Sequence, residues 1–171
     1  TSTSGDTKGA LTFHTRDVVT DTAPSEQMRI GSAGIVTMPS QPAFGVYKTS
    51  STGSGSDVTH DGSYSNVGNH YSSSTGRFTC PVAGTYYFYC TGLTMNTGNI
   101  SRISLRANGS KKASESRNEN ISGVYLHILT VGVMTLSAND YVTMYYENDD
   151  GGTNLYSDTS PYISFGGYLI G

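Results

Sequence analysis

The stretch from Tyr64 to Phe88, YSNVGNHYSSSTGRFTCPVAGTYYF, carries the densest structural pattern in this chain. From Tyr86 to Tyr89 aromatic side chains occupy consecutive positions, so they alternate between the two faces of an extended strand. Aromatic residues on both faces are typical of a strand that is covered on both sides. The turn signal Pro81-Val82-Ala83-Gly84 precedes this strand, and we expect Gly84 to adopt a positive φ there.

Similar strand-like runs recur on either side of this stretch, separated by clusters rich in Ser, Thr, Gly and Asn. Short strands at regular spacing favour an all-β sandwich or barrel. We predict strands at Ala43–Lys48, Val58–His60, Tyr64–Asn66, Gly76–Cys80, Thr85–Gly92, Arg102–Ala107, Val124–Leu136, Tyr141–Glu147 and Tyr162–Ile170. Gly166-Gly167 in the last of them indicates a close backbone approach or a bulge. No helix is expected, and residues 111–120 are the least unfavourable segment for one.

The composition narrows the class of protein. Of 171 residues 13% are charged, 21 are glycine and 13 are tyrosine, a profile that argues against helical bundles and against disorder. The net charge of −3 comes without a basic stripe, which argues against nucleic-acid binding. The longest apolar run, Gly123–Leu136, is shorter than the roughly 20 residues of a membrane span, so we expect no membrane insertion. Since neither an initial Met nor a signal peptide is visible, we expect a part of a longer protein.

The chain divides by pattern into three parts. Residues 1–10 are polar and aperiodic, so we expect a flexible linker. Residues 11–41 hold short β-type pieces, Leu11–Thr15, Gln27–Ile30 and Ile35–Met38, that cannot bury a core alone and need partner chains or a neighbouring domain. Residues 42–171 form the main domain.

Two cysteines, Cys80 and Cys90, flank the turn before the aromatic strand. If that turn closes a tight hairpin, Cys80 faces a residue near Thr85 and Cys90 lies several pairs further along. Their Cα atoms would then exceed the roughly 7 Å that a disulfide allows. We therefore expect two free, mostly buried thiols.

The stretch Tyr64–Phe88 resembles the C1q globular-head family of the C1q/tumour-necrosis-factor superfamily, and segments on both sides agree with that family in order and spacing. The residues that carry the resemblance are Phe44, Asn66, Gly76, Phe78, Pro81, Gly84, Tyr86, Phe88, Asp140, Phe165 and Gly167. The resemblance covers residues 42–171. It implies an all-β fold, a ten-stranded jelly-roll sandwich, that assembles into a tight homotrimer.

A second resemblance concerns the N-terminal pieces. Phe13-His14-Thr15 and Ser25–Gly34 are similar to segments near the distal end of bacteriophage tail fibres and other virion appendages, although Gln27 stands where those have Arg. Such segments form the intertwined β-stalk of a trimeric fibre. The resemblance implies a stalk at 11–41 that contacts other virion proteins and a C1q-like knob at 42–171. The collagen Gly-x-y run that accompanies animal C1q domains does not occur in this sequence.

Residues for catalysis or metal binding are sparse. No histidine has metal-ligand spacing and no nucleophile elbow occurs, so we expect no enzyme. Calcium needs several oxygen ligands, and Asp149-Asp150 with Asp158 is the best cluster. Some C1q-like trimers hold calcium through acidic residues, at positions where this chain resembles them but has Asn99 and Asn108. We expect no metal and no cofactor, with calcium as the alternative.

These observations favour a non-enzymatic trimeric knob of a viral, bacteriophage-type tail fibre or virion appendage that binds a host-surface receptor or glycan. Three copies would raise avidity through effective concentration. Two alternatives stay open. One is a purely structural virion protein, such as a capsid decoration or tail-assembly trimer. The other is a secreted cellular C1q-like lectin, which would be extracellular rather than part of a virion.

Strand alternation predicts where recognition would occur. If the stalk enters at the base of the jelly roll, the turns Pro81–Gly84, Asn108-Gly109 and Ser137–Asp140 lie at the base. The loops expected at the tip are Thr49–Ser56, Val67–Ser74, Thr94–Asn99, Asn118–Ser122 and Asn148–Ser157. Long loops on a rigid scaffold are common recognition surfaces. The candidate contact residues are Tyr71, Asn96, Asn120, Asp149, Asp150 and Tyr156.

Overall fold

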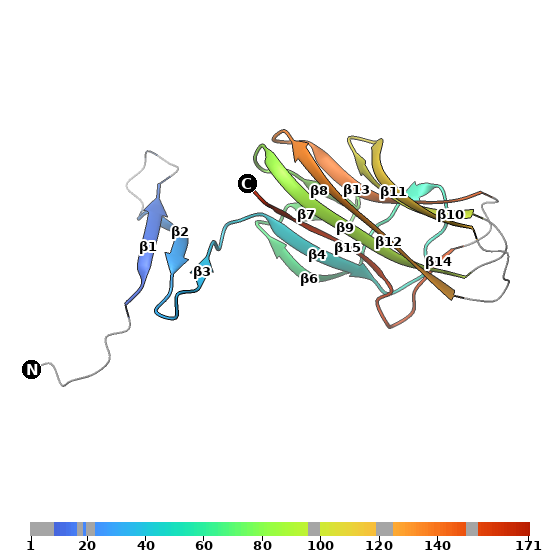
Figure 1. Ribbon diagram of the computed structural model, residues 1–171, viewed down its shortest axis with the longest axis horizontal. Coiled ribbons are helices and arrows are strands. Elements are labelled where there is room, and N and C mark those ends of the chain that lie inside the picture. Colours follow the sequence, from blue (N-terminus) through green and yellow to red (C-terminus); the bar gives the residue numbers. More distant parts are fainter. Residues whose placement is uncertain (1–8, 17–18, 20–22, 96–99, 119–124, 150–153) are drawn as a thin grey trace, which may run out of the picture. The chain divides into compact units, whose positions relative to one another are not determined.

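The computed structural model describes residues 9–16, 19, 23–95, 100–118, 125–149 and 154–171. Every regular element among these residues is a β-strand (Figure 1). The chain divides into two compact units, Thr1–Gln41 and Pro42–Gly171. The described residues contain no helix that is long and apolar enough to cross a membrane.

The N-terminal unit is one small antiparallel sheet. Its strands are β1 (Leu11–Thr15), β2 (Ser25–Ile30) and β3 (Val36–Thr37), in the order β1-β2-β3. None of its described residues is buried, and apolar side chains such as Leu11 (57%) and Ile35 (65%) are largely exposed. A sheet of three short strands has too little apolar surface to form a core of its own.

The C-terminal unit is a sandwich of two six-stranded sheets (Figure 1). The first, here called the β10 sheet, has the order β11 (Ser110–Asn118), β10 (Ile100–Ala107), β13 (Tyr141–Asn148), β8 (Arg77–Thr79) and β7 (Tyr71–Ser72), with β5 (Ser56–Asp57) beside β13. The second, the β9 sheet, has the order β12 (Tyr125–Leu136), β9 (Gly84–Met95), β15 (Ile163–Leu169), β4 (Ala43–Lys48) and β6 (Gly62–Val67), with β14 (Leu155–Tyr156) beside β9. The predicted jelly-roll sandwich is confirmed.

Aromatic rings join the two sheets. Phe44 on β4 stacks on Phe78 of the opposite sheet, with ring centroids 4.6 Å apart, and meets Phe165 edge-on at 4.8 Å. Tyr86 and Phe88 are fully buried in the same cluster, as the alternation along β9 predicts. Complete burial of such a side chain contributes about 1.5–3 kcal/mol. The residues that carry the C1q resemblance therefore include the centre of the core.

Several assignments made from sequence need correction. Val58–His60 is not a strand: it makes one ladder-like bond, from the Val58 amide to the Met144 carbonyl, and then crosses between the sheets. The segment expected as the least unfavourable helix is largely the strand β11, whose polar sequence suits an edge that water covers. The strands β5, β7 and β14 were missed, since two residues carry no periodicity.

The turn before β9 also differs from expectation. Gly84 does not have a positive φ; a Cβ at this position would lie 2.6 Å from Leu169 Cδ1 and 3.1 Å from the Gly171 carbonyl oxygen, so the glycine makes room for the closing strand. The turn joins β8 in one sheet to β9 in the other and closes no hairpin. Cys80 and Cys90 are free and buried. The expected free thiols thus occur, for a different reason from the hairpin register.

Strand pairing and backbone hydrogen bonds show which segments lie at each end of the sandwich. The base is the end that holds Ala43 and Gly171. Pro81–Gly84 and Ser137–Asp140 meet there, where the Asn139 amide donates to the Cys80 carbonyl. Val67 pairs with Ala43, so the loop Val67–Ser74 begins at the base and not at the tip as expected. The error follows from the prediction of Val58–His60 as a strand. Because that strand does not exist, β6 runs opposite to the expected direction, and the loop after it begins at the base.

Gly166 and Gly167 allow β15 to approach its neighbours closely. A Cβ on Gly166 would lie 2.6 Å from the Tyr89 ring on the outward face, and one on Gly167 would lie 2.5 Å from the Phe88 ring and the Tyr87 carbonyl oxygen. The register of β15 with β4 and β9 is continuous. Of the two alternatives raised by this glycine pair, the close approach is the correct one.

We expect Gly167→Ala to lower the free energy of unfolding by about 2–3 kcal/mol, because the new methyl group meets a backbone oxygen that cannot rotate away. Urea denaturation followed by fluorescence measures the change. Gly53→Ala is the matched control, since its Cβ meets only Asn154 Oδ1 at 3.8 Å. Equal stability of the two variants would contradict the proposed packing.

Candidate functional site

The outward face of the β9 sheet is rich in exposed apolar and aromatic side chains. We call this surface the tyrosine face. It consists of Tyr47, Tyr64, Tyr87, Tyr89 and Tyr168 together with Leu129, Val131 and Val133. Except for Tyr64, which sits at the bulge of β6, each of these residues alternates along its strand with a residue that faces the core. On β12 the exposed fractions reach 53% for Leu129, 49% for Val131 and 62% for Val133.

The aromatic rings of this face are organised in pairs. Tyr47 lies 4.6 Å from Tyr64, and Tyr87 lies 5.4 Å from Tyr168, between ring centroids. A contiguous apolar patch on a protein surface marks an interaction site more often than a solvated wall. The tyrosine face is therefore a candidate protein interface.

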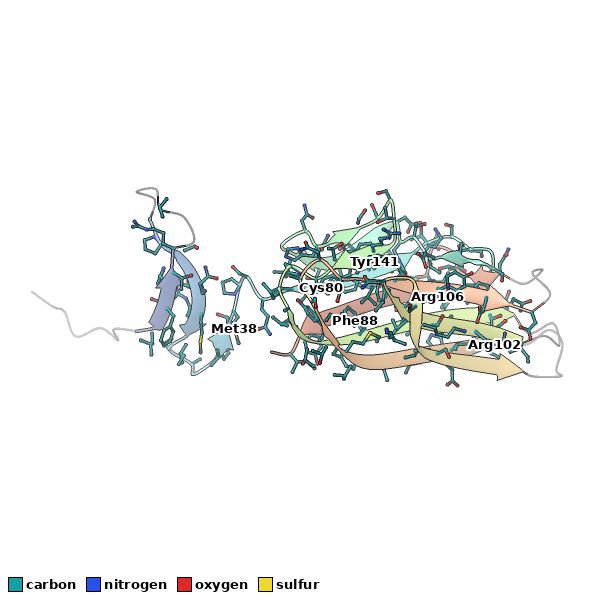
Figure 2. All side chains as sticks on the ribbon, turned by 90° about the horizontal axis from the view of Figure 1, so that it is seen from above. Met38, Cys80, Phe88, Arg102, Arg106 and Tyr141 are labelled. Carbon is teal, nitrogen blue, oxygen red and sulfur yellow. The ribbon has the colours of Figure 1, made fainter. Side chains whose placement is uncertain are left out.

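The outward face of the β10 sheet has the opposite character. Arg102 on β10 pairs with Asp149, and Lys111 Nζ lies 2.7 Å from Glu147 Oε1. The guanidinium of Arg106 lies over the Tyr145 ring, 3.2 Å from its centroid. Figure 2 shows Arg102 and Arg106 along the same strand. Ion pairs and cation–π contacts of this kind suit a solvated surface.

Three tyrosines meet at the tip and form what we call the tip cluster: Tyr125, Tyr156 and Tyr162. The Tyr156 ring lies 4.9 Å from Tyr125 and 6.0 Å from Tyr162, between centroids. Its hydroxyl donates a hydrogen bond to Asp158 Oδ2 at 3.0 Å, and this bond raises the pKa of Tyr156. The cluster offers aromatic surface beside a carboxylate.

The tip candidates chosen from sequence have different outcomes. Tyr156 belongs to the tip cluster, and its partners Tyr125 and Tyr162 were missed although both stand where a strand begins or is about to begin. Asp149 is exposed and paired with Arg102. The candidates Asn96, Asn120 and Asp150 lie outside the described residues.

Tyr71 is not a tip contact. It is 7% exposed, and its hydroxyl lies 2.8 Å from His60 Nδ1. Its backbone amide donates to Asn66 Oδ1, and Asn66 Nδ2 donates back to the Tyr71 carbonyl, both at 3.0 Å. This exchange of bonds explains Asn66 among the residues of the C1q resemblance, because it ties the end of β6 to β7.

The pair of His60 and Tyr71 is buried with little charge compensation. Burial raises the pKa of Tyr71 and lowers the pKa of His60 to about 3, with the Lys48 charge lowering it further. His60 is therefore neutral at physiological pH. A neutral imidazole has one donor and one acceptor nitrogen.

This depressed pKa predicts a pH-dependent stability. The unfolded chain binds a proton near pH 6.5 and the folded state only near pH 3, so the free energy of unfolding falls as pH falls between these values. We expect a loss of about 1.5 kcal/mol from pH 6.5 to pH 5. The variant His60→Phe keeps a ring and removes the titration. Denaturation curves should show a shallower pH dependence for it, and parallel curves would contradict the assignment.

Carboxylates of the expected calcium cluster are engaged by protein donors. Asp149 binds Arg102, and Asp158 accepts hydrogen bonds from the Tyr156 hydroxyl and the Ser160 amide. In the part of the chain that the structure describes, no three His, Cys, Asp or Glu side chains gather where they could hold a metal ion. Calcium binding stays an alternative prediction.

Comparison with known proteins assigns the family. The model of the C1q domain matches residues 43–170. This chain therefore belongs to the C1q domain family, and the resemblance drawn from Tyr64–Phe88 is confirmed. The globular domain of zebrafish complement 1qA has a TM-score of 0.63 and 24% identity, covering 77% of this chain and 98% of that one, a likeness in fold.

A curated relative is the mouse complement C1q and tumor necrosis factor-related protein 9. It is 32% identical over 107 residues, which are 60% of this chain and 29% of the mouse protein. The chain therefore spans less than a third of the length of this relative.

Proposed function

We propose that this chain is a non-enzymatic homotrimeric binding module that works outside cells, without a cofactor, and recognises a receptor or glycan with its tip. The observation that carries the proposal is the tyrosine face. Leu129, Val131 and Val133 expose about half or more of their surface along one strand. Membership of the C1q family implies the trimer, since such domains typically assemble in threes.

Energetics support a self-association through this face. Full burial of one exposed Leu or Val contributes up to about 1.5–3 kcal/mol, so several half-exposed side chains on each of three copies add up to a stable interface. Tyrosine supplies contact area at low conformational cost. The charged residues lie instead on the β10 sheet, where burial would carry a desolvation cost.

The tip cluster supports ligand binding at the end away from the base. Tyrosines beside a carboxylate combine an aromatic platform with polar contacts, as in other recognition surfaces. A trimer presents three such clusters on one end. Weak single contacts therefore add up to higher avidity when the target is multivalent.

The comparisons favour a secreted cellular module, because both relatives come from animals and carry complement-type names. A virion appendage is the second candidate, with the chain as the knob of a fibre. The observation in its favour is the N-terminal unit, whose described residues form a sheet without a core and contain no collagen repeat. Genes that flank the one encoding this chain would distinguish the two settings.

The trimer can be tested with one charge. Val131→Asp places a carboxylate in the middle of the tyrosine face, and we expect it to convert the trimer to a monomer, measured by sedimentation velocity. Thr79→Asp puts the same group on the exposed side of β8 and should leave the trimer intact. A wild-type chain that sediments as a monomer at micromolar concentration would refute the proposal.

The tip cluster can be tested separately. We expect fluorescently labelled wild-type trimer to bind at least one glycan or cell type, and Tyr156→Ala to weaken binding per site by about tenfold, the loss of roughly one good aromatic contact. Tyr145→Ala, on the outward face of the β10 sheet, is the matched control. Binding that is unchanged by Tyr156→Ala but lost with Tyr145→Ala would move the site to the other sheet.

A further inference from the structure

A pocket of about 270 Å³ opens at one edge of the sandwich. It lies where β6, the edge strand of the β9 sheet, meets β7, the edge strand of the β10 sheet. His60 and Asp61 reach it from the segment that crosses between the sheets, and Ser63, Asn69 and Ser73 line it from β6 and the loop beyond. We call it the histidine pocket.

His60, one of the lining residues, carries an unpartnered buried nitrogen. His60 is 2% exposed, its Nδ1 is bonded to the Tyr71 hydroxyl, and its Nε2 has no hydrogen-bond partner in the described part of the protein. Leaving such an atom unpaired costs about 1–3 kcal/mol. The His60 ring lines the pocket while its Nε2 is shielded from water, so the accessible polar groups of the pocket are those of its wall.

The wall of the pocket offers further unused polar groups. Asp61 Oδ1 accepts a bond from the Thr49 amide at 2.9 Å, which holds the carboxylate in place and leaves Oδ2 for a ligand. Asn69 is fixed by a positive φ of 63° and by the bond from Asn66 to its Oδ1, which leaves its Nδ2 as a donor. The hydroxyls of Ser63 and Ser73 make no hydrogen bond to the residues that the structure describes.

The polar groups that line the pocket indicate which class of ligand it can bind. The lining has one carboxylate and no Lys or Arg, so an anion is disfavoured, and one carboxylate is too few for a cation such as calcium. A carboxylate oxygen, an amide and two hydroxyls match a ligand whose groups both donate and accept. Val46 and Tyr71 add an apolar wall for the carbon face of a ring.

We propose that the histidine pocket binds one hexopyranose residue at the end of a neutral glycan. At about 270 Å³ it lies just below the range of pockets for drug-sized ligands, about 300–1,000 Å³, which suits one sugar ring. The inference goes beyond the proposed function, because it names a second binding site and the class of ligand that this site takes. It differs from the tip cluster, because the pocket opens at the edge near the base-side loop Val67–His70.

The test uses the whole chain and free sugars. Saturation-transfer NMR with millimolar galactose, glucose, mannose and N-acetylglucosamine should show transfer to at least one of them. We expect Asp61→Asn, which keeps the bond from the Thr49 amide, to weaken the binding of that sugar by about tenfold, the value of one hydrogen bond. We expect the same loss of affinity for Ser63→Ala. Ser110→Ala, an exposed serine at the start of β11, is the matched control and should bind like wild type.

The outcomes separate this inference from the proposed function. If Val131→Asp gives a monomer that still binds the sugar, the pocket works within a single chain, as proposed. Saturation transfer to no sugar, or transfer that Asp61→Asn and Ser63→Ala leave unchanged, would overturn the inference. Either result leaves the proposed trimer and the tip cluster to be tested by their own experiments, sedimentation velocity and the binding of labelled trimer.

Discussion

Contact between aromatic rings across the two sheets is the interaction on which the rest of the structure depends. Phe44 and Phe165 come from the β9 sheet and Phe78 from the β10 sheet, and their rings meet at 4.6–4.8 Å. Gly167 lets β15, which carries Phe165, lie directly against the Phe88 ring of the same cluster. The position of every outward residue on β4, β9 and β15 follows from this packing, because a strand has two faces and one of them is committed to the core.

That commitment explains why the two outer surfaces differ. On β9 and β15 the outward positions include Tyr87, Tyr89 and Tyr168, with Tyr89 seated over Gly166. On β10 and β13 the outward positions carry Arg102, Arg106 and Glu147. Arg106 pairs with Glu147, and Arg102 pairs with Asp149 just after β13. A sandwich with one apolar outer face and one charged outer face has a built-in direction for assembly, since only the first gains from losing contact with water.

Much of this fold could be predicted from the residues. The alternation from Tyr86 to Tyr89 and the recurring short strands predicted an all-β sandwich or barrel, and the resemblance of Tyr64–Phe88 implied the jelly roll. Local pattern failed where structure came from long-range pairing. The strand β11 is polar and is held by the ladder to β10, and Gly84 responds to Leu169, far along the chain, rather than to its own turn.

The candidate sites were harder to predict, for a related reason. Tyr71 looked like a loop residue, and only the crossing of Val58–Asp61 between the sheets brings His60 against its hydroxyl. Tyr125, Tyr156 and Tyr162 come from three separate segments and meet because β12, β14 and β15 all have an end at the tip. The spacing of residues along one sequence does not show which of them become neighbours when distant strands pair.

The edges of a sandwich are the natural places for such chemistry. Within the two sheets the backbone groups are paired and the side chains are committed to a core or to an outer face. Among the described residues, at the edge formed by β6 and β7 neither sheet path continues to a further strand, and polar atoms such as His60 Nε2 and Asp61 Oδ2 make no bond to a strand. A fold whose faces serve packing and assembly therefore leaves its edges and its tip for recognition, and this division allows one rigid core to support binding without changing its strands.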